Sequence, residues 1–283
     1  MKTTKGFLII CQGNPIYGEM AYNLAVTLRA TGNHFPICLV YNDSAISRLS
    51  KEQHNFFTDK ILMDEHFINI RLKLPEITPY DYTLALDCDL LWLNKDAGEL
   101  FNILDSIDFT VENFGYINTN GETDGDNEYL HWANFEDIEN AYPIEGRLYK
   151  CCNSFILFKK SEKVNELFKL WAEIQSQPKC KYIEWCNSCP DEFSLNIALN
   201  LLKLEPHKSR WRVGKWLLGD ATYFPISHHA KDYYAINAGG NIKTRRDIEY
   251  YNLTAQAAFD KLNLPFNFKL KSKRDHIKER IKM

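Results

Sequence analysis

Short apolar runs that alternate with amphipathic segments constrain the fold of this chain more than any other feature of its sequence. Each run is short and bounded by turn residues, so it indicates a buried strand. The expected strands are Phe7–Cys11, Ile37–Tyr41, Lys60–Met63, Tyr82–Cys88, Phe109–Glu112 and Phe155–Phe158. Strands that alternate with helices are typical of α/β proteins. The sequence therefore predicts an α/β fold in one domain, with a mixed, mainly parallel central sheet flanked by helices.

Amphipathic segments supply the expected helices. The most regular one has apolar residues at helical spacing from Val164 to Ile174, with Ser161 as its N-cap and Pro178 just beyond its end. The other expected helices run from about Glu19 to Arg29, from Phe193 to Leu202, and onward from a start near Thr254.

Composition excludes several classes of protein. Of the 283 residues, 45% are hydrophobic and 25% are charged, which is ordinary for a globular protein with a full core. The net charge of −3 argues against a protein that coats nucleic acid with its whole surface. No apolar run approaches the ~20 residues that span a bilayer. We therefore expect a cytoplasmic protein whose eight cysteines are free thiols. A structural zinc on Cys180, Cys186 and Cys189 with Cys151 or Cys152 remains an alternative.

Two segments differ in composition from the rest of the domain, 1–265. Residues 116–150 form an acidic insertion with eight acidic and two basic residues. Its aromatic residues suit either sugar stacking or local packing; they include Tyr129, His131, Trp132, Phe135 and Tyr142. Residues 266–283 form a basic C-terminal tail with seven basic residues against two acidic ones. The tail could hold the protein peripherally on the inner face of a membrane, or contact DNA, which we favour less.

The stretch Leu84–Trp92 carries the clearest chemical signal, because its apolar strand ends in two acids. Asp87 and Asp89 flank Cys88, and alternate residues of a strand face the same side. Two neighbouring carboxylates repel each other and are costly to desolvate, and a divalent cation removes both penalties. Oxygen ligands suit Mn²⁺ or Mg²⁺ better than Zn²⁺. The alternative is a pair of acids in a solvated loop.

A strand that ends Asp87-Cys88-Asp89, downstream of an N-terminal βα unit, resembles the nucleotide-sugar glycosyltransferases of the GT-A fold. The closest pattern is that of glycosyltransferase family 8 and its bacterial and phage relatives. The family's basic helix before this strand is matched by Arg71 and Lys73, and its "aspartate-glutamine" pair by Asp191-Glu192. The resemblance implies a metal-dependent enzyme that moves a hexose from a UDP-sugar to an acceptor and retains the anomeric configuration.

The resemblance also implies roles for individual residues. It places the donor nucleotide and its phosphates against Gln12, Gly13, Tyr17, Asn42, Asp43, Lys73, Asp87, Gly240 and Lys243. It places Asn153, Asp191 and Glu192 at the reaction centre. The metal ligands are Asp87, Asp89 and a third residue that the family supplies as a histidine. Asn237 stands at that position here, so the third ligand is either Asn237 or one of His228 and His229.

Two other functions fit parts of the sequence. A sugar-phosphate nucleotidyltransferase has a related fold but should carry a glycine-rich, basic loop after its first strand, and residues 12–17 contain no basic residue. A nucleic-acid-binding protein could act through the basic tail alone. The acceptor of a glycosyltransferase would bind in variable loops. The identity of the acceptor therefore cannot be predicted from the sequence.

Overall fold

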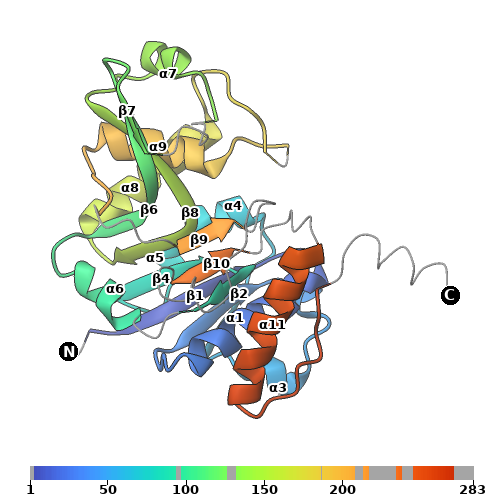
Figure 1. Ribbon diagram of the computed structural model, residues 1–283. Helices are drawn as coiled ribbons and strands as arrows, with labels where there is room; N and C mark the ends of the chain where they lie inside the picture. The colour runs from blue at the N-terminus through green and yellow to red at the C-terminus, as the bar shows by residue number, and fades with distance from the viewer. Residues whose placement is uncertain are drawn as a thin grey trace. The chain divides into compact units, whose positions relative to one another are not determined.

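The structure is a computed structural model that describes residues 3–93, 97–125, 132–185, 187–207, 213–216, 234–237 and 245–270. Its strands form a seven-stranded sheet in the order β3-β2-β1-β4-β8-β6-β7 and a three-stranded sheet in the order β5-β10-β9 (Figure 1). The strands are β1 (Lys5–Cys11), β2 (Ile37–Tyr41), β3 (Asp59–Leu62), β4 (Tyr82–Asp87), β5 (Leu90–Trp92), β6 (Phe109–Asn118), β7 (Thr123–Gly125), β8 (Arg147–Lys159), β9 (Val213–Trp216) and β10 (Ala235–Asn237).

Helices connect most of these strands. They are α1 (Pro15–Ala30), α2 (Asp43–Ile46), α3 (Lys51–His54), α4 (Phe67–Leu72), α5 (Leu74–Ile77), α6 (Ala97–Ile103), α7 (Phe135–Ala141), α8 (Glu162–Ser176), α9 (Asp191–Leu201) and α11 (Arg245–Lys261). Within the described part of the chain, none of these helices has both the length and the apolar character that a membrane crossing requires.

The expected α/β architecture, with a mixed central sheet flanked by helices, is confirmed. β1, β2 and β3 pair in parallel, so that Cys11 lies opposite Tyr41, and Tyr41 lies opposite Leu62. The carboxyl ends of the three strands therefore meet at one edge, which is where open α/β sheets bind their ligands. β6 pairs antiparallel with both β7 and β8, which makes the sheet mixed.

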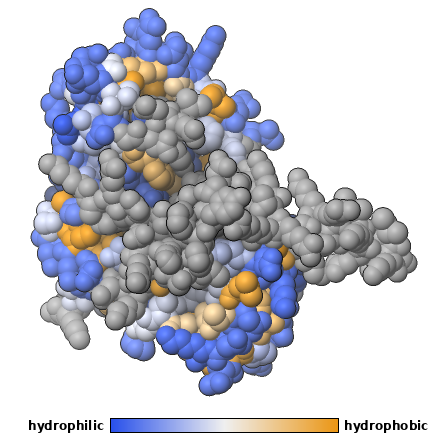
Figure 2. All heavy atoms as spheres, in the orientation of Figure 1, coloured by the Kyte–Doolittle hydropathy of each residue, from blue (hydrophilic) through white to orange (hydrophobic). Residues whose placement is uncertain are grey.

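The chain divides into two compact units, each described here by itself. Unit 1 comprises residues 1–6, 65–85 and 100–211, and unit 2 comprises residues 7–64, 86–99 and 212–283. Residues of the expected domain, 1–265, contribute to both units. Figure 2 shows hydrophilic residues over most of the visible described surface, with hydrophobic residues in smaller areas between them.

In unit 2, α1 packs against α2, α11 and β5, and Figure 1 shows α11 running alongside α1. Gly18 allows the contact between α1 and α2, because a Cβ atom there would lie 2.2 Å from the carbonyl oxygen of Ala45. Behind α1, a buried cluster joins Met20, Leu91 and Tyr251. Side chains from three separate parts of the chain thus hold the first helix in place.

The chain beyond α11 continues along this core. Phe266 and Phe268 pack against the cluster, and Leu270 is part of it. The Asn252 side chain fixes Leu270 with two hydrogen bonds, from its Nδ2 to the Leu270 carbonyl (3.0 Å) and from the Leu270 N–H to its Oδ1 (2.8 Å). The first five residues of the expected basic tail, 266–270, therefore belong to the packed part of unit 2. Residues 271–283 lie outside the described residues.

In unit 1, β8 packs against α9, which also packs against α8. Aromatic rings fill the space between them: Phe168 contacts Trp171 at a centroid distance of 5.2 Å and Phe158 at 5.6 Å. The ends of the acidic insertion are strands, since β6 continues to Asn118 and β8 begins at Arg147, and Leu148 is fully buried. The expectation of a solvated excursion is therefore wrong for those ends.

Three helices begin earlier than the sequence predicted, and α9 does so by two residues, at Asp191 instead of Phe193. α1 starts at Pro15, because the Asn14 Oδ1 accepts the N–H of Ile16 (3.0 Å) and caps the helix. α11 starts at Arg245 rather than near Thr254. Thr254 does not cap this helix; its hydroxyl donates to the carbonyl of Tyr250 (2.9 Å), one turn earlier in the same helix.

Candidate functional site

The loop after β1 lies at the carboxyl edge of the parallel strands in unit 2. Gly13 has a φ of +84°, which favours glycine, and its N–H donates to the Asn42 Oδ1 (3.1 Å). The same oxygen accepts the N–H of Ala45 (3.0 Å) and caps α2. Asn42 therefore holds together the two loops that follow β1 and β2.

Gln12 precedes this glycine and has a buried side-chain amide. Neither its nitrogen nor its oxygen has a hydrogen-bond partner among the described residues. A buried amide is costly without partners, so an incoming ligand with a donor and an acceptor would satisfy it. This observation fits the expected role of Gln12 against a nucleotide. Asp43 is exposed at the start of α2, whereas Tyr17 packs partly buried against the core cluster behind α1.

The two acids of the Asp-x-Asp motif bracket a tight turn. Asp87 is the last residue of β4, Cys88 and Asp89 form the turn, and β5 begins at Leu90. The pKa of the buried Cys88 thiol is raised well above its usual value by a hydrogen bond with the Cys11 side chain, by burial, and by the charges of Cys11 and both acids. The Cys88 contact with Cys11 ties the acidic turn to the end of β1, just before Gln12.

Two further elements of unit 2 approach the acidic turn. β10 pairs antiparallel with β5 and sets Asn237 opposite Leu90, next to Asp89. Asn237 is 3% exposed. On the α11 side, burial raises the pKa of the Tyr251 hydroxyl, and the charge of Asp89 adds to this effect. Tyr251 is positioned by a hydrogen bond from the Asn23 Nδ2 (3.2 Å).

These residues fit the divalent cation that the sequence predicts. Carboxylates from Asp87 and Asp89 and an amide oxygen from Asn237 are the ligand types of Mn²⁺ or Mg²⁺. Groups of three His, Cys, Asp or Glu side chains that could hold a metal do not occur among the residues that the structure describes. His228, His229, Gly240 and Lys243 lie outside those residues, so the choice between Asn237 and a histidine as third ligand stays a prediction.

Unit 1 contains a separate group of buried acids at the start of α9. The carboxylate of Asp191 pairs with the guanidinium of Arg71, and both side chains are at least nine-tenths buried. The main-chain oxygen of Asp191 accepts the indole N–H of Trp171 (2.9 Å). The ion pair and the helix start together fix the orientation of Asp191. Lys73 is the second basic residue that the resemblance places in the donor site. The Lys73 ammonium pairs with the Glu65 carboxylate (2.7 Å), and both side chains are partly exposed.

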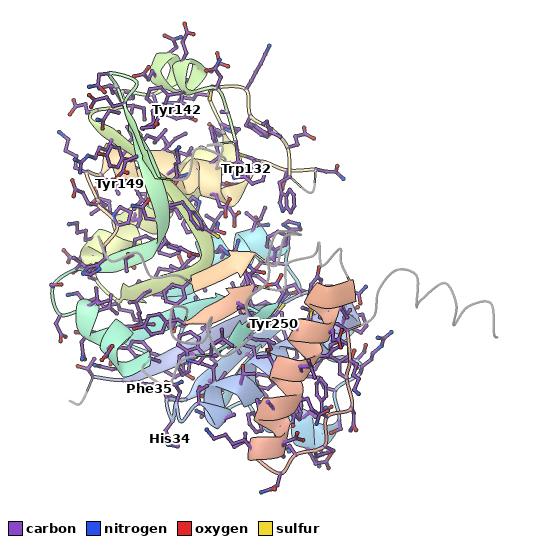
Figure 3. The ribbon with its side chains drawn as sticks, in the orientation of Figure 1. His34, Phe35, Trp132, Tyr142, Tyr149 and Tyr250 are labelled. Carbon is purple, nitrogen blue, oxygen red and sulfur yellow. The ribbon has the colours of Figure 1, made fainter. Side chains whose placement is uncertain are left out.

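Glu192, the next residue, is 8% exposed. Burial raises its pKa to about 7, with a further contribution from the charge of Asp191, while hydrogen bonds from Trp132 and Cys152 and the charge of Arg71 oppose the shift. The Trp132 indole N–H donates to the Glu192 Oε2 (2.8 Å), and Figure 3 labels Trp132 near α9. A pKa of about 7 is in the range that suits a group that transfers protons at neutral pH.

Asn153 lies in an irregular part of β8. The register with β6 pairs Val111 with Ile156 but the next residue, Glu112, with Cys152, so residues 153–155 have no partner position on β6. Bulges of this kind re-aim side chains and are frequent beside active sites. The Asn153 Nδ2 is buried without a hydrogen-bond partner in the described parts of the chain. This geometry fits the expected role of Asn153 in ligand contact.

Among the cysteines of the alternative zinc site, Cys189 is buried and Cys180 is partly buried. Burial raises the pKa of Cys189 to about 12, and the charges of Asp191 and Cys180 add to the shift. Burial likewise raises the pKa of Cys180. Bound zinc would itself deprotonate these thiols, so a structural zinc stays an untested alternative. Cys186 lies outside the described residues.

Comparison with known proteins identifies solved structures with a similar fold. No protein-family model matches the chain, and no curated protein does. Among solved structures, the chain is similar to the apo form of the bifunctional glycosyltransferase WbbM, with 13% identity and a TM-score of 0.55 over 92% of this chain and 52% of WbbM. It is also similar to the galactosyltransferase LgtC in complex with donor and acceptor sugar analogues, with 13% identity and a TM-score of 0.54 over 89% of this chain and 95% of LgtC.

The chain thus has a glycosyltransferase fold of the GT-A type, as its Asp-x-Asp strand predicted. It spans about half the length of WbbM and nearly all of LgtC. At this level of identity the similarity defines the fold, and the activity has to be argued from the residues.

Proposed function

We propose that this protein is a metal-dependent glycosyltransferase, related to family 8, that moves a hexose from a UDP-sugar to an acceptor. The observation that carries the proposal is the acidic turn at the end of β4: Asp87 and Asp89 flank a buried thiol in contact with Cys11, the last residue of β1. LgtC, which has the same fold, was solved with donor and acceptor sugar analogues, and a donor and an acceptor are proposed here accordingly.

In unit 2, Asp87 and Asp89 would hold Mn²⁺ or Mg²⁺ with Asn237 or one of His228 and His229. When bound, the cation stabilises the negative charge that develops on the departing nucleoside diphosphate. Gln12 uses its buried amide to bind the nucleotide, and Gly13, with Asn42 behind it, brings the main chain close to the same ligand. Asp43, Tyr17, Lys73, Gly240 and Lys243 stay expected donor contacts.

In unit 1, each of the buried polar residues has a distinct proposed role. Asp191 is held in place by Arg71, and its carboxylate orients the transferred sugar by accepting hydrogen bonds from the hydroxyl groups of that sugar. Glu192 takes a proton from the acceptor hydroxyl, because its pKa near 7 leaves a fraction of the carboxyl free to accept one. Asn153 donates a hydrogen bond to the bound sugar from its buried Nδ2, which has no partner among the described residues.

The test is a screen of UDP-, GDP- and TDP-sugars with Mn²⁺, with Mg²⁺ and with excess chelator, measured as released nucleotide. We expect release from a UDP-sugar only when a divalent cation is present. Asp87→Asn and Asp89→Asn should each abolish it, whereas Asp105→Asn, an exposed acid in the turn after α6, should not. Metal-independent release by Asp87→Asn at the wild-type rate would contradict the proposal.

A further inference from the structure

Two tryptophans of unit 1 come together from separate parts of the chain. The rings of Trp132 and Trp185 have centroids 5.7 Å apart and planes at 56°. Trp132 precedes α7 in the acidic insertion, whereas Trp185 belongs to the segment between α8 and α9. The two segments are joined where the N–H of Ile183 donates to the carbonyl of Trp132 (2.6 Å).

The main chain holds both rings in defined positions. Trp132 has a φ of +60°, a conformation that is unfavourable for a bulky L-residue and persists only where the surroundings enforce it. Its indole N–H is used by Glu192. Trp185 and Ser188 form an antiparallel bridge with two main-chain hydrogen bonds (2.9 and 3.0 Å). Each tryptophan is thus held by hydrogen bonds to other parts of unit 1.

The apolar surface here is exposed, unlike that of the aromatic core between α8 and β8. Trp185 is 42% exposed and Ile183 is 52% exposed. Only four large hydrophobic residues among those described are exposed in this way, and two of them lie in this one short segment. The Trp185 side chain is therefore partly packed and partly open to solvent, where a ligand can reach it.

The charge of the insertion favours an uncharged ligand. The sequence of the insertion that carries Trp132, residues 116–150, has eight acidic and two basic residues, and the Glu192 carboxylate accepts the indole N–H at the edge of the Trp132 ring. Such surroundings repel a phosphate group, so a nucleotide or phospholipid headgroup is disfavoured. An uncharged pyranose offers an apolar face to an aromatic ring and hydroxyl groups to neighbouring polar atoms.

We propose that Trp132 and Trp185 form a stacking platform for a pyranose ring of the acceptor, which makes the acceptor a saccharide and places its binding beside Glu192. This inference rests on the proposed glycosyltransferase function. It assigns recognition of the acceptor to Trp132, in the acidic insertion, and to Trp185, between α8 and α9.

The direct test is binding without a donor. Full-length protein is titrated with lactose, maltose, cellobiose and N-acetyl-lactosamine, and binding is followed by intrinsic tryptophan fluorescence and by calorimetry. We expect at least one of these sugars to bind, and Trp185→Ala to weaken its affinity about tenfold, as the loss of one stacking contact predicts. Trp185→Phe should recover most of the affinity, because it keeps a ring. Leu253→Ala, at an exposed apolar position on α11 outside the platform, should bind as wild type.

Kinetics separate this inference from the proposed function. If nucleotide is released from a UDP-sugar, Trp185→Ala should raise the KM for the sugar acceptor about tenfold while the KM for the donor changes less than about twofold. Saccharide binding without any transferase activity would support the platform and contradict the proposed function. Absence of binding by all four sugars, or equal binding by Trp185→Ala and wild type, would overturn the platform.

Discussion

Arg71 and Asp191 form a buried ion pair that joins the end of α4 to the first residue of α9. Both side chains are at least nine-tenths buried, and the guanidinium also lies over the ring of Phe67, 5.6 Å from its centroid. A buried ion pair contributes little when both partners are present, but removing one partner leaves an uncompensated charge. This pair therefore makes the position of the candidate reaction centre depend on α4.

We expect Arg71→Met to lower the free energy of unfolding by about 3–5 kcal/mol, because it leaves the Asp191 carboxylate buried and unpaired. The measurement is denaturant unfolding at neutral pH. Lys73→Met is the matched control: its partner Glu65 is partly exposed, so the loss should stay below about 1 kcal/mol. Arg71→Met combined with Asp191→Asn should be more stable than Arg71→Met alone. Equal stability of Arg71→Met and Lys73→Met would contradict this account of the pair.

Glu192 should make the stability of the protein depend on pH. Its pKa is about 7 in the folded protein and near 4.5 in the unfolded chain, so the folded state binds the proton more tightly. The stabilisation is fully present below pH 4.5, decreases as the pH rises, and is lost above pH 7. A shift of this size corresponds to about 3 kcal/mol.

Glu192→Gln removes this titration and keeps an oxygen that can accept the N–H of Trp132. Unfolding free energies of both proteins are compared between pH 5 and pH 8. We expect the variant to gain about 2–3 kcal/mol relative to wild type across this range. Glu173→Gln, at an exposed position on α8, should track the wild type at every pH. A difference between Glu192→Gln and wild type that does not change with pH would refute the assignment.

Asn237 is the described candidate for the third metal ligand. Asn237→Ala should weaken Mn²⁺ binding about tenfold or more, and Asn237→Asp should strengthen it by adding a charge. The measurement is the signal of free Mn²⁺ in electron paramagnetic resonance, which requires no turnover. If Asn237→Ala binds Mn²⁺ as wild type does, whereas His228→Ala or His229→Ala does not, the third ligand is that histidine.

Local sequence signals predicted the parts of the fold that depend on them. The apolar run Ile37–Tyr41 forms a strand with those bounds, and four of its five residues are buried. The 3.6-residue spacing from Val164 to Ile174 likewise gave α8, whose N-cap Ser161 accepts the N–H of Val164 (3.3 Å). Asp87 lies at the end of β4 as expected, whereas Cys88 and Asp89 form the turn after it instead of continuing the strand, so the expectation that both acids share one strand face was wrong for Asp89.

Contacts between distant residues could not be predicted in this way. Arg71 and Asp191 are separated by 120 positions, and Trp132 and Glu192 by 60, so no spacing in the sequence indicates either pair. The shift of register that re-aims Asn153 depends on how β6 and β8 pair, which periodicity does not reveal. The pKa of Glu192 depends on the burial of its side chain in the folded protein, so the sequence could not predict it either.

Residues 262–270 show an alternating apolar pattern that the basic composition of the chain's end obscured. Leu262, Leu264, Phe266, Phe268 and Leu270 alternate with exposed residues, and all five are at least partly buried. An alternating pattern of this kind is typical of an extended segment with one face on a core. Because basic residues follow this pattern, the composition indicated a separate tail that begins at residue 266. The segment that packs on the core of unit 2 continues to Leu270.

Truncations at two positions test where the core ends and what the remaining tail does. Deleting 266–283 removes Leu270 and the ring contact between Phe266 and Phe259, whose centroids are 5.0 Å apart. It should lower the free energy of unfolding by at least about 3 kcal/mol. Deleting 271–283 should leave stability within about 1 kcal/mol, since the two hydrogen bonds between Asn252 and Leu270 remain.

The shorter truncation also isolates the expected membrane contact. Six of the tail's seven basic residues lie within 271–283, and each contributes about 1 kcal/mol near an anionic surface. Full-length protein should therefore bind vesicles that contain phosphatidylserine at low salt and release them at high salt, and the protein without 271–283 should not bind. Cosedimentation with vesicles measures this, with duplex DNA as a competing ligand. Binding to DNA but not to vesicles would assign the tail to nucleic acid, and vesicle binding that survives the truncation would move the contact elsewhere.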